Sequence, residues 1–261
     1  MDLYALLSDQ LGYFMIIFVR ISGIFITAPV FGSRNFPVYA KAGLSLLLSF
    51  MMFPLLYSAA ITIPSQLLTY GFILLGELLI GIIIGYVSSF VFSAVQMAGQ
   101  LLDMQIGFGV VNVIDPQFGQ QVPLVGNFKY ILALLVFLAT NGHHILLGAL
   151  FASFKIIPVT TGGFSVAITG IVVDMVFGIF VTALKISLPV LVALVLTDIA
   201  LGILARTMPQ MNIFIVGIPG KIFIGLFVLT LSLPFYIAFL EVGFNDMYKD
   251  IYRLLGSLSR T

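Results

Sequence analysis

The chain contains the run LLIGIIIGYVSSFVFSAVQMAGQLL, from Leu78 to Leu102, in which no residue carries a charge. As an α-helix this run would be roughly 37 Å long, more than the ~30 Å hydrocarbon core of a bilayer. Hydrophobic residues make up 61% of the whole chain and charged residues 8%. Soluble domains have roughly 45–50% and about 25% respectively. The sequence therefore predicts an all-α, multi-pass integral membrane protein.

Six apolar segments are long enough for the roughly 20 residues that a spanning helix needs. They are residues 10–31, 42–61, 67–98, 130–151, 166–205 and 212–240. The fifth is too long for one plain span and contains Pro189, so it could be a tight hairpin or a broken or strongly tilted helix. Counts of six or seven spans both remain open. Because Asp2 and Asp9 precede a long first apolar stretch, we expect no cleaved signal peptide.

A polar middle loop, residues 99–123, overlaps the end of the quoted run and continues beyond it. It contains two aspartates, five glutamines and four glycines. Its apolar part, Phe108 to Ile114, is too short to cross a membrane and too apolar for an ordinary exposed loop. We expect the glycines to provide turns and Asp115-Pro116 to set a turn at the loop's base.

The helix expected before this loop has one polar face. Its members follow steps of four, three, four and three and form a stripe roughly 21 Å long: Ser89, Ser93, Gln96, Gln100 and Asp103. Gly81 and Gly85, one turn earlier, form a G-x-x-x-G pattern that allows close helix approach. The stripe is either a helix–helix interface or a pore-lining or subunit-facing surface, and both alternatives keep it away from lipid.

Five charged residues lie within or beside the apolar segments: Arg20, Glu77, Asp174, Lys185 and Asp198. Each would cost about 2.5–3.5 kcal/mol at a bilayer centre. Pairing between helices or subunits, ion or proton translocation, and extension to the membrane interface are the three interpretations. Asp174 and Lys185 share a helix face but would be about 16 Å apart along it, so they cannot pair on one straight helix.

The chemistry of an enzyme is missing from the sequence. Without cysteine there are no disulfides or thiolate metal sites. His143 and His144 are adjacent, a poor spacing for a shared metal ion, and no hydrolase, zinc-protease or phosphate-loop motif occurs. The net charge of +1 argues against nucleic acid as a partner. We expect no enzymatic activity, metal or cofactor.

A second polar loop separates the last two apolar segments. Its candidate functional residues are Arg206, Pro209, Gln210, Asn212, Pro219 and Lys221. On the residues alone it is a turn at the membrane interface, with Arg206 and Lys221 at the level of the headgroups.

At this point the sequence resembles the FliR family, the flagellar biosynthesis proteins of type III export gates, whose relatives occur in injectisomes. The similarity covers essentially the whole chain. Its motifs are Arg20-Ile21-Ser22-Gly23 with Ala28-Pro29, Gly76–Gly81, Gly99-Gln100, Met104-Gln105, Gly107, Asp115-Pro116, Asn141-Gly142-His143, Pro158, Arg206, Pro209-Gln210, Asn212, Gly217, Pro219 and Lys221. The resemblance gives no role to Asp103 or His144, because family members vary at these two positions.

The resemblance implies a non-enzymatic subunit of the flagellar type III protein export gate. It places the protein in the bacterial inner (cytoplasmic) membrane, at the flagellar basal body. The implied partners are FliP, FliQ and FlhB, exported unfolded proteins in transit, and membrane lipid. The implied architecture is one of broken helical hairpins, with residues 1–170 similar to FliP and residues 171–261 similar to FliQ.

The resemblance also gives the middle loop a role, that of an apolar plug in the channel. The implied plug residues are Phe108, Val110, Val111, Val113 and Ile114, on a base of Gln100, Gln105, Gly107, Gly109, Asp115 and Pro116. A ring of apolar side chains can close a pore by dewetting, which fits this composition.

Two other classes of protein compete with the export gate. A secondary transporter or ion channel acting alone would use Asp174, Lys185 and Asp198 in the proline-interrupted segment. A scaffold without any channel surface is the third alternative.

Overall fold

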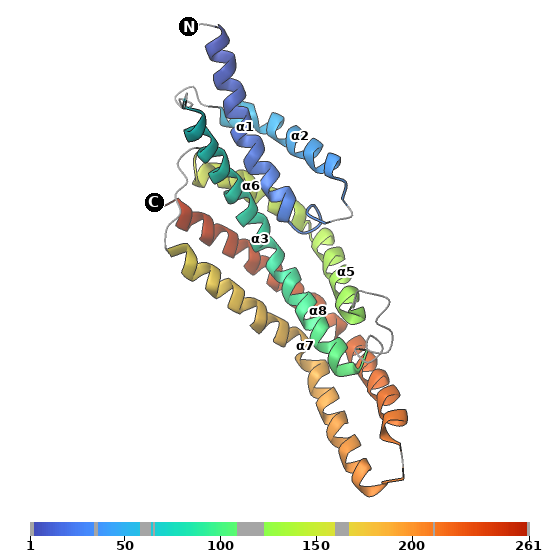
Figure 1. Ribbon diagram of the computed structural model, residues 1–261. Helices are drawn as coiled ribbons and strands as arrows, with labels where there is room; N and C mark the ends of the chain where they lie inside the picture. The colour runs from blue at the N-terminus through green and yellow to red at the C-terminus, as the bar shows by residue number, and fades with distance from the viewer. Residues whose placement is uncertain are drawn as a thin grey trace. The chain divides into compact units, whose positions relative to one another are not determined.

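The computed structural model describes residues 3–33, 36–57, 64, 66–108, 123–159, 167–210 and 212–259. Within them the helices are α1 (Leu3–Thr27), α2 (Val38–Leu56), α3 (Leu67–Ile106), α5 (Leu124–Ala139), α6 (Gly142–Ile156), α7 (Ala167–Thr207) and α8 (Ile213–Leu258) (Figure 1). The described part of the chain contains no β-strand. The predicted all-α fold is therefore confirmed.

Five helices are long and apolar enough to cross a membrane: Asp9–Thr27, Val38–Leu56, Leu67–Ile106, Thr169–Thr207 and Ile215–Leu258. The bent pair α5 and α6 could supply a sixth span. The predicted class of multi-pass membrane protein is thus confirmed. α3, α7 and α8 contain 40, 41 and 46 residues. Since each is roughly 60–69 Å long, a part of each must extend beyond a single hydrocarbon core.

Two segments differ from the sequence-based expectation. Residues 130–151 are not one helix, because α5 and α6 meet at an angle of 68°. Asn141 lies at this bend with φ of 57°, in the left-handed region that asparagine enters more readily than most residues. Conversely, α7 continues unbroken through Pro189, so the hairpin alternative for residues 166–205 is wrong over the described part of that segment.

The chain forms two compact units. Unit 1 comprises Met1–Phe90, Asn141–Met175 and Asn245–Thr261, and unit 2 comprises Val91–Thr140 and Val176–Phe244. α3, α7 and α8 each contribute to both units. The proposed similarity of residues 1–170 to FliP and of residues 171–261 to FliQ concerns relationships to other families, and it stays a prediction.

Helix α2 in unit 1 has the polarity expected in lipid. It buries Ser45 and Ser49, while Phe50 is 72% and Leu55 77% exposed. The serine hydroxyls donate to backbone carbonyls within the helix, at 2.8 Å and 2.6 Å. In water this arrangement would be unfavourable, because the large apolar side chains would be exposed to solvent while the small polar ones are buried. In a membrane, small residues at helix contacts and large apolar ones facing outward are normal.

Helices α1 and α3 touch backbone to backbone in unit 1. A Cβ atom built on Gly81 would lie 2.1 Å from the carbonyl oxygen of Arg20, and one on Gly85 would lie 2.2 Å from Oγ1 of Thr27. A side chain at Gly81 would collide with the backbone of α1, and one at Gly85 would have to displace the Thr27 hydroxyl. The predicted close approach at the G-x-x-x-G pattern is therefore confirmed.

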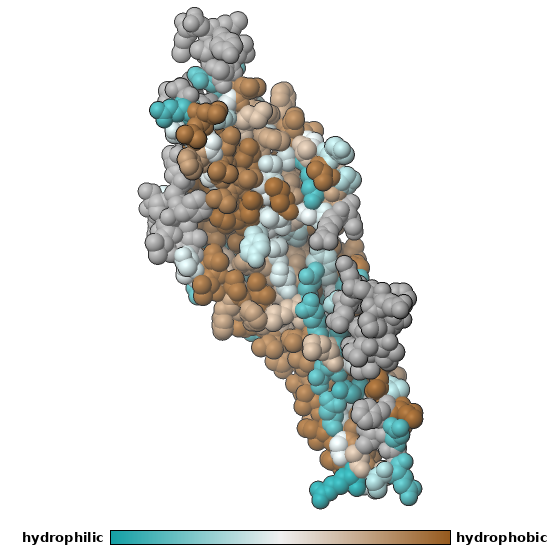
Figure 2. Space-filling model, viewed as in Figure 1, coloured by the Kyte–Doolittle hydropathy of each residue, from teal (hydrophilic) through white to brown (hydrophobic). Residues whose placement is uncertain are grey.

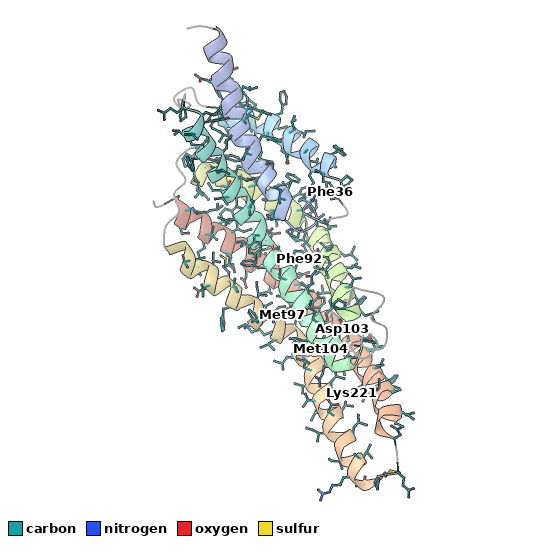
Figure 3. The ribbon with its side chains drawn as sticks, in the orientation of Figure 1. Phe36, Phe92, Met97, Asp103, Met104 and Lys221 are labelled. Atoms are coloured by element: carbon teal, nitrogen blue, oxygen red, sulfur yellow. The ribbon has the colours of Figure 1, made fainter. Side chains whose placement is uncertain are left out.

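Unit 2 packs α3, α5, α7 and α8 around one apolar core. Its buried members are Leu102, Ile106, Val125, Val190, Leu194 and Leu229. A second contact in this unit joins the rings of Phe92, Phe137 and Phe244, whose centroids lie 5.2–5.5 Å apart. Figure 3 labels Phe92 on α3. These contacts hold α3 against its neighbours up to the start of the middle loop.

We expect Gly81→Ala to destabilise the protein, because its methyl group must displace the backbone of α1. Overpacking of this kind typically costs about 1–3 kcal/mol. Thermal unfolding in mild detergent measures the effect. Gly76→Ala is the matched control on the same helix, since a Cβ there meets nothing within 4 Å. Equal melting temperatures for the two variants would contradict the close contact.

Candidate functional site

The described start of the middle loop lies at the end of α3. Gly107 has φ of +105°, a conformation that essentially only glycine adopts without strain. The turn expected of this glycine is therefore present. Phe108, the next residue, is half-buried and packs against the unit 2 core. Among the expected plug residues, Phe108 is the one that the structure describes, and it lies against protein.

The other end of the middle loop is attached to α3 by Asp103. Its side chain, labelled in Figure 3, is 7% exposed. Oδ1 accepts the N–H of Val125 at 3.0 Å, and Oδ2 accepts the N–H of Gly126 at 3.1 Å. These amides belong to the first turn of α5, where no intrahelical carbonyl is available. A carboxylate there also interacts favourably with the helix dipole. We call this contact the Asp103 cap.

A close approach of two glycines reinforces the Asp103 cap. A Cβ atom built on Gly99 of α3 would lie 2.0 Å from Cα of Gly126 in α5. Pro123, before α5, provides no side-chain cap. The carboxylate from α3 therefore supplies a capping group that the local sequence lacks. Pro123, where the described chain resumes, lines a groove with Gln96 and Gln100 of α3.

The polar stripe of α3 contains both exposed and buried residues at this junction. Gln96 and Gln100 are exposed, whereas Asp103 is buried. The two glutamines line a groove of about 210 Å³ together with Pro123, Gly126 and Asn127. Gln100, expected at the base of the plug loop, is thus placed beside the Asp103 cap.

A second polar contact joins three helices in unit 2. Gln105 of α3 donates through Nε2 to Oδ2 of Asp198 on α7, at 3.0 Å. Lys221 of α8 forms an ion pair with Oδ1 of Asp198, at 2.8 Å. The side chains of Lys221 and Asp198 are 20% and 43% exposed. The sequence analysis placed these three residues in three separate groups, and the structure brings them together.

The second loop lies at the turn between α7 and α8. Arg206, Pro209, Gln210 and Asn212 are exposed there, and Pro219 is exposed within the first turns of α8. Figure 2 shows hydrophilic residues gathered at this turn, beside the hydrophobic surface of the two helices. Lys221 lies further along α8, so its partner is Asp198 rather than the turn.

A buried ion pair occupies the interior of unit 1. Arg20 and Glu77 are both buried, and Nε of Arg20 donates to Oε2 of Glu77. One terminal nitrogen of Arg20 also donates to the carbonyl of Ile157 at 3.0 Å. The guanidinium carbon lies 4.3 Å from the centre of the Phe154 ring. Arg20 therefore joins α1, α3 and the end of α6.

The remaining charged candidates lie on the surface of α7. Asp174 and Lys185 are exposed, and within the described ranges neither forms an ion pair. Lys185 is in the middle of a helix of 41 residues. Within the described residues, both side chains are therefore on a surface that other protein does not cover.

The sequence analysis gave no role to Lys129, which is 1% exposed within unit 2. Its ammonium lies 4.9 Å from the centre of the Tyr236 ring, and the hydroxyl of Tyr236 donates to the carbonyl of Lys129 at 2.9 Å. The contact is a cation–π pair joining α5 to α8. The sequence does not indicate this pair, because Lys129 sits at the edge of a charge-free run, where a position at the membrane interface is the simpler interpretation.

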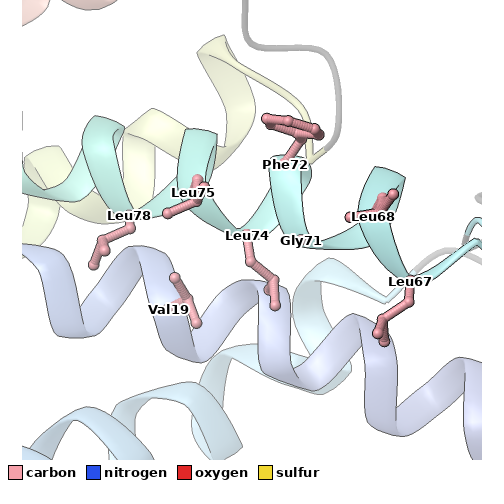
Figure 4. Close-up of a pocket in the computed structure, with 8 residues that line it drawn as sticks. All are labelled: Val19, Leu67, Leu68, Gly71, Phe72, Leu74, Leu75 and Leu78. Carbon is pink, nitrogen blue, oxygen red and sulfur yellow. The ribbon is translucent and has the colours of Figure 1, made fainter.

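Unit 1 also contains an apolar groove between α1 and α3 (Figure 4). Its volume is about 520 Å³, and its lining consists of Val19, Leu67, Leu68, Gly71, Phe72, Leu74, Leu75 and Leu78. Specific small-molecule sites combine apolar walls with a few placed polar groups. This groove has no polar side chain in its lining to orient a ligand.

Several predicted residues lie outside the described part of the chain. They are Gly109, Val110, Val111, Val113, Ile114, Asp115 and Pro116. Their roles in the plug and its base stay predictions. Within the described residues, no group of three or more potential ligands is placed to hold a metal ion.

These features define a class: a multi-pass helical membrane protein whose polar side chains join helices to one another. Comparison with known proteins is more specific. The family model described as bacterial export proteins, family 1, matches residues 11–247. The chain therefore belongs to that family.

Proteins named flagellar biosynthetic protein FliR are similar to the chain over nearly their whole length. The chain is 38% identical to that of Bacillus subtilis (strain 168), covering 95% of this chain and 96% of the relative. It is 32% identical to that of Pectobacterium carotovorum subsp. carotovorum, covering 93% and 92%. For the Escherichia coli (strain K12) protein the identity is 28%, covering 92% and 91%.

Replacing Asp103 by alanine should loosen the first turn of α5. Each charge-assisted hydrogen bond lost from a buried group costs about 1.5–3 kcal/mol. Hydrogen exchange followed by mass spectrometry should show faster exchange in the peptide that contains Val125 and Gly126. Asp103→Asn keeps one acceptor oxygen and should give an intermediate result. Unchanged exchange in both variants would contradict the Asp103 cap.

The Arg20–Glu77 pair predicts strong coupling between the two residues. Arg20→Met alone leaves a buried carboxylate without its partner, which typically costs about 3–5 kcal/mol. Arg20→Met combined with Glu77→Met should be less destabilised than the single variant. A double-mutant cycle of thermal unfolding in detergent measures this difference, and additive effects would count against the ion pair.

Proposed function

We propose that this chain is a non-enzymatic subunit of the flagellar type III protein export gate. In this proposal it resides in the bacterial inner membrane at the flagellar basal body. It helps to form and seal the channel through which unfolded flagellar proteins are exported. Membership of a bacterial export family and similarity to FliR proteins over nearly the whole chain support it.

The observation that carries the channel role is the anchoring of the middle loop. The Asp103 cap attaches one end to α3, and Phe108 packs against the unit 2 core at the other end. A loop fixed at both ends can hold an apolar segment in a channel without a permanent covalent or ionic closure. A passing polypeptide could displace apolar side chains without unpairing buried charges.

The surface of the chain supports membership of a larger assembly. Asp174 and Lys185 are exposed on the apolar helix α7. At the depth of the hydrocarbon core each would cost about 2.5–3.5 kcal/mol. Contact with further subunits or a water-filled space would remove that cost. FliP, FliQ and FlhB are the partners we propose for this surface and for the gate as a whole.

A test of subunit membership is the mass of the complex purified in mild detergent. The proposal expects the chain in a complex with the other gate subunits. A stable monomer or homo-oligomer with transport activity of its own would instead support the class of secondary transporters or ion channels.

The plug assignment predicts an ion leak when apolar side chains are removed. Phe108→Gly, Val110→Gly and Val113→Gly together should raise resting ion conductance, because dewetting needs apolar bulk. Membrane potential measured in cells with equal amounts of assembled gate reports the leak. Leucine at the same three positions is the matched control and should keep the channel sealed. Wild-type conductance in the glycine variant would contradict the plug.

A further inference from the structure

We propose that the contact of Gln105, Asp198 and Lys221, here called the polar cluster, positions Phe108 by attaching the end of α3 to α7 and α8. The proposal rests on the proposed function, in which Phe108 contributes to the seal of the channel. It adds a specific mechanical connection between the α7–α8 hairpin and that seal.

The first step is the geometry of the polar cluster. The carboxylate of Asp198 accepts hydrogen bonds from two helices at once, from Gln105 at 3.0 Å and from Lys221 at 2.8–3.0 Å. The ammonium balances the carboxylate, so the contact carries no net charge. The uncharged carboxamide of Gln105, on α3, is the third member of the polar cluster. The consecutive helices α7 and α8 and the distant helix α3 are therefore joined at one carboxylate.

The second step is the position of Phe108 relative to the polar cluster. Gln105 precedes Gly107 by two residues and Phe108 by three. A Cβ atom built on Gly107 would lie 4.0 Å from a methyl group of Ile218. Phe108 and Ile222 both pack against the same apolar core of unit 2. Ile218 and Ile222 flank Lys221 in the chain, so one stretch of α8 both pairs with Asp198 and borders the start of the loop.

The polar cluster and the Asp103 cap attach α3 to different helices. Asp103 attaches α3 to α5, where the loop returns. The polar cluster attaches α3 to α7 and α8, which follow later in the chain. The Asp103 cap therefore holds the end of the loop, and the polar cluster holds its start. Movement of the α7–α8 hairpin would reach Phe108 through the polar cluster, whereas the Asp103 cap would leave that hairpin free.

The strength of the polar cluster suits a positioning role. Lys221 and Asp198 are partly exposed, and ion pairs of this kind contribute little to overall stability. Breaking the contact should therefore allow the protein to fold and assemble while Phe108 is held less firmly. A purely structural pair would show the opposite pattern, with lost assembly and no specific change at Phe108.

The experiment uses the absence of cysteine from the native sequence. Ile222→Cys introduces a single thiol into this chain, at a residue that packs against the same apolar core as Phe108, and keeps the phenylalanine. The rate at which a maleimide reacts with this thiol is measured on the assembled, purified gate complex. Adding Lys221→Met or Asp198→Asn should raise the rate on the order of fivefold or more, the lower range of ordinary coupling between sites.

Two further variants separate positioning from general disruption. The exchange Asp198→Lys with Lys221→Asp should restore the slow rate, because the carboxamide of Gln105 can accept from an ammonium as well as donate to a carboxylate. Lys249→Met breaks another ion pair of 2.8 Å on α8, the exposed i,i+3 pair with Asp246, and should leave the rate unchanged. An unchanged rate with Lys221→Met, or an exchange variant as fast as the single ones, would overturn the proposal.

Ion leakage in cells distinguishes this proposal from the proposed function. If Lys221→Met accelerates the maleimide reaction and also raises ion conductance, both the positioning role of the polar cluster and the sealing role of Phe108 are supported. If the reaction accelerates while conductance stays at the wild-type level, the polar cluster positions Phe108 but the seal does not depend on that residue. If the glycine plug variant leaks and Lys221→Met changes neither reaction rate nor conductance, the plug stands and the polar cluster has no positioning role.

Discussion

The α3–α5 junction depends on the Asp103 cap. Two amide groups at the start of α5 need acceptors, and Pro123 before them supplies none through its side chain. The carboxylate of Asp103 accepts from both, and the Gly99–Gly126 approach brings the two backbones into contact. A buried carboxylate is costly unless it is fully hydrogen-bonded, and free amides are costly unless they find an acceptor. Each group therefore requires the other.

Other buried charged side chains in the described residues also have partners. Arg20 and Glu77 pair inside unit 1, and Lys129 lies over the ring of Tyr236 inside unit 2. Outward-facing positions carry large apolar side chains, as the hydrophobic surface in Figure 2 shows. In lipid the driving force for helix association comes from close packing and polar contacts rather than from hydrophobic burial. The glycine contacts between α1 and α3 supply that close packing.

Hydropathy predicted the helices and the membrane class because spanning segments must be apolar and must satisfy their own backbone groups. It did not predict the bend at Asn141, which depends on one left-handed residue, and it left open whether α7 continues through Pro189. The G-x-x-x-G contact was predictable, because glycines at that spacing allow two helix backbones to approach each other closely. The contact of Gln105, Asp198 and Lys221 was not, because it joins positions up to 116 apart in the sequence and depends on how three helices pack. Asp103 carries no local capping signal either, since its partners follow it by 22 and 23 residues.

We propose that Phe108 lies where an exported chain passes. Placing a photocrosslinking amino acid at position 108, in cells that contain assembled gates and a stalled export substrate, tests it most directly. The account predicts a crosslink between this chain and the substrate, which disappears when the substrate is released. Repeated absence of that crosslink, with assembly intact and the stalled substrate present, would contradict the channel role and favour a scaffold.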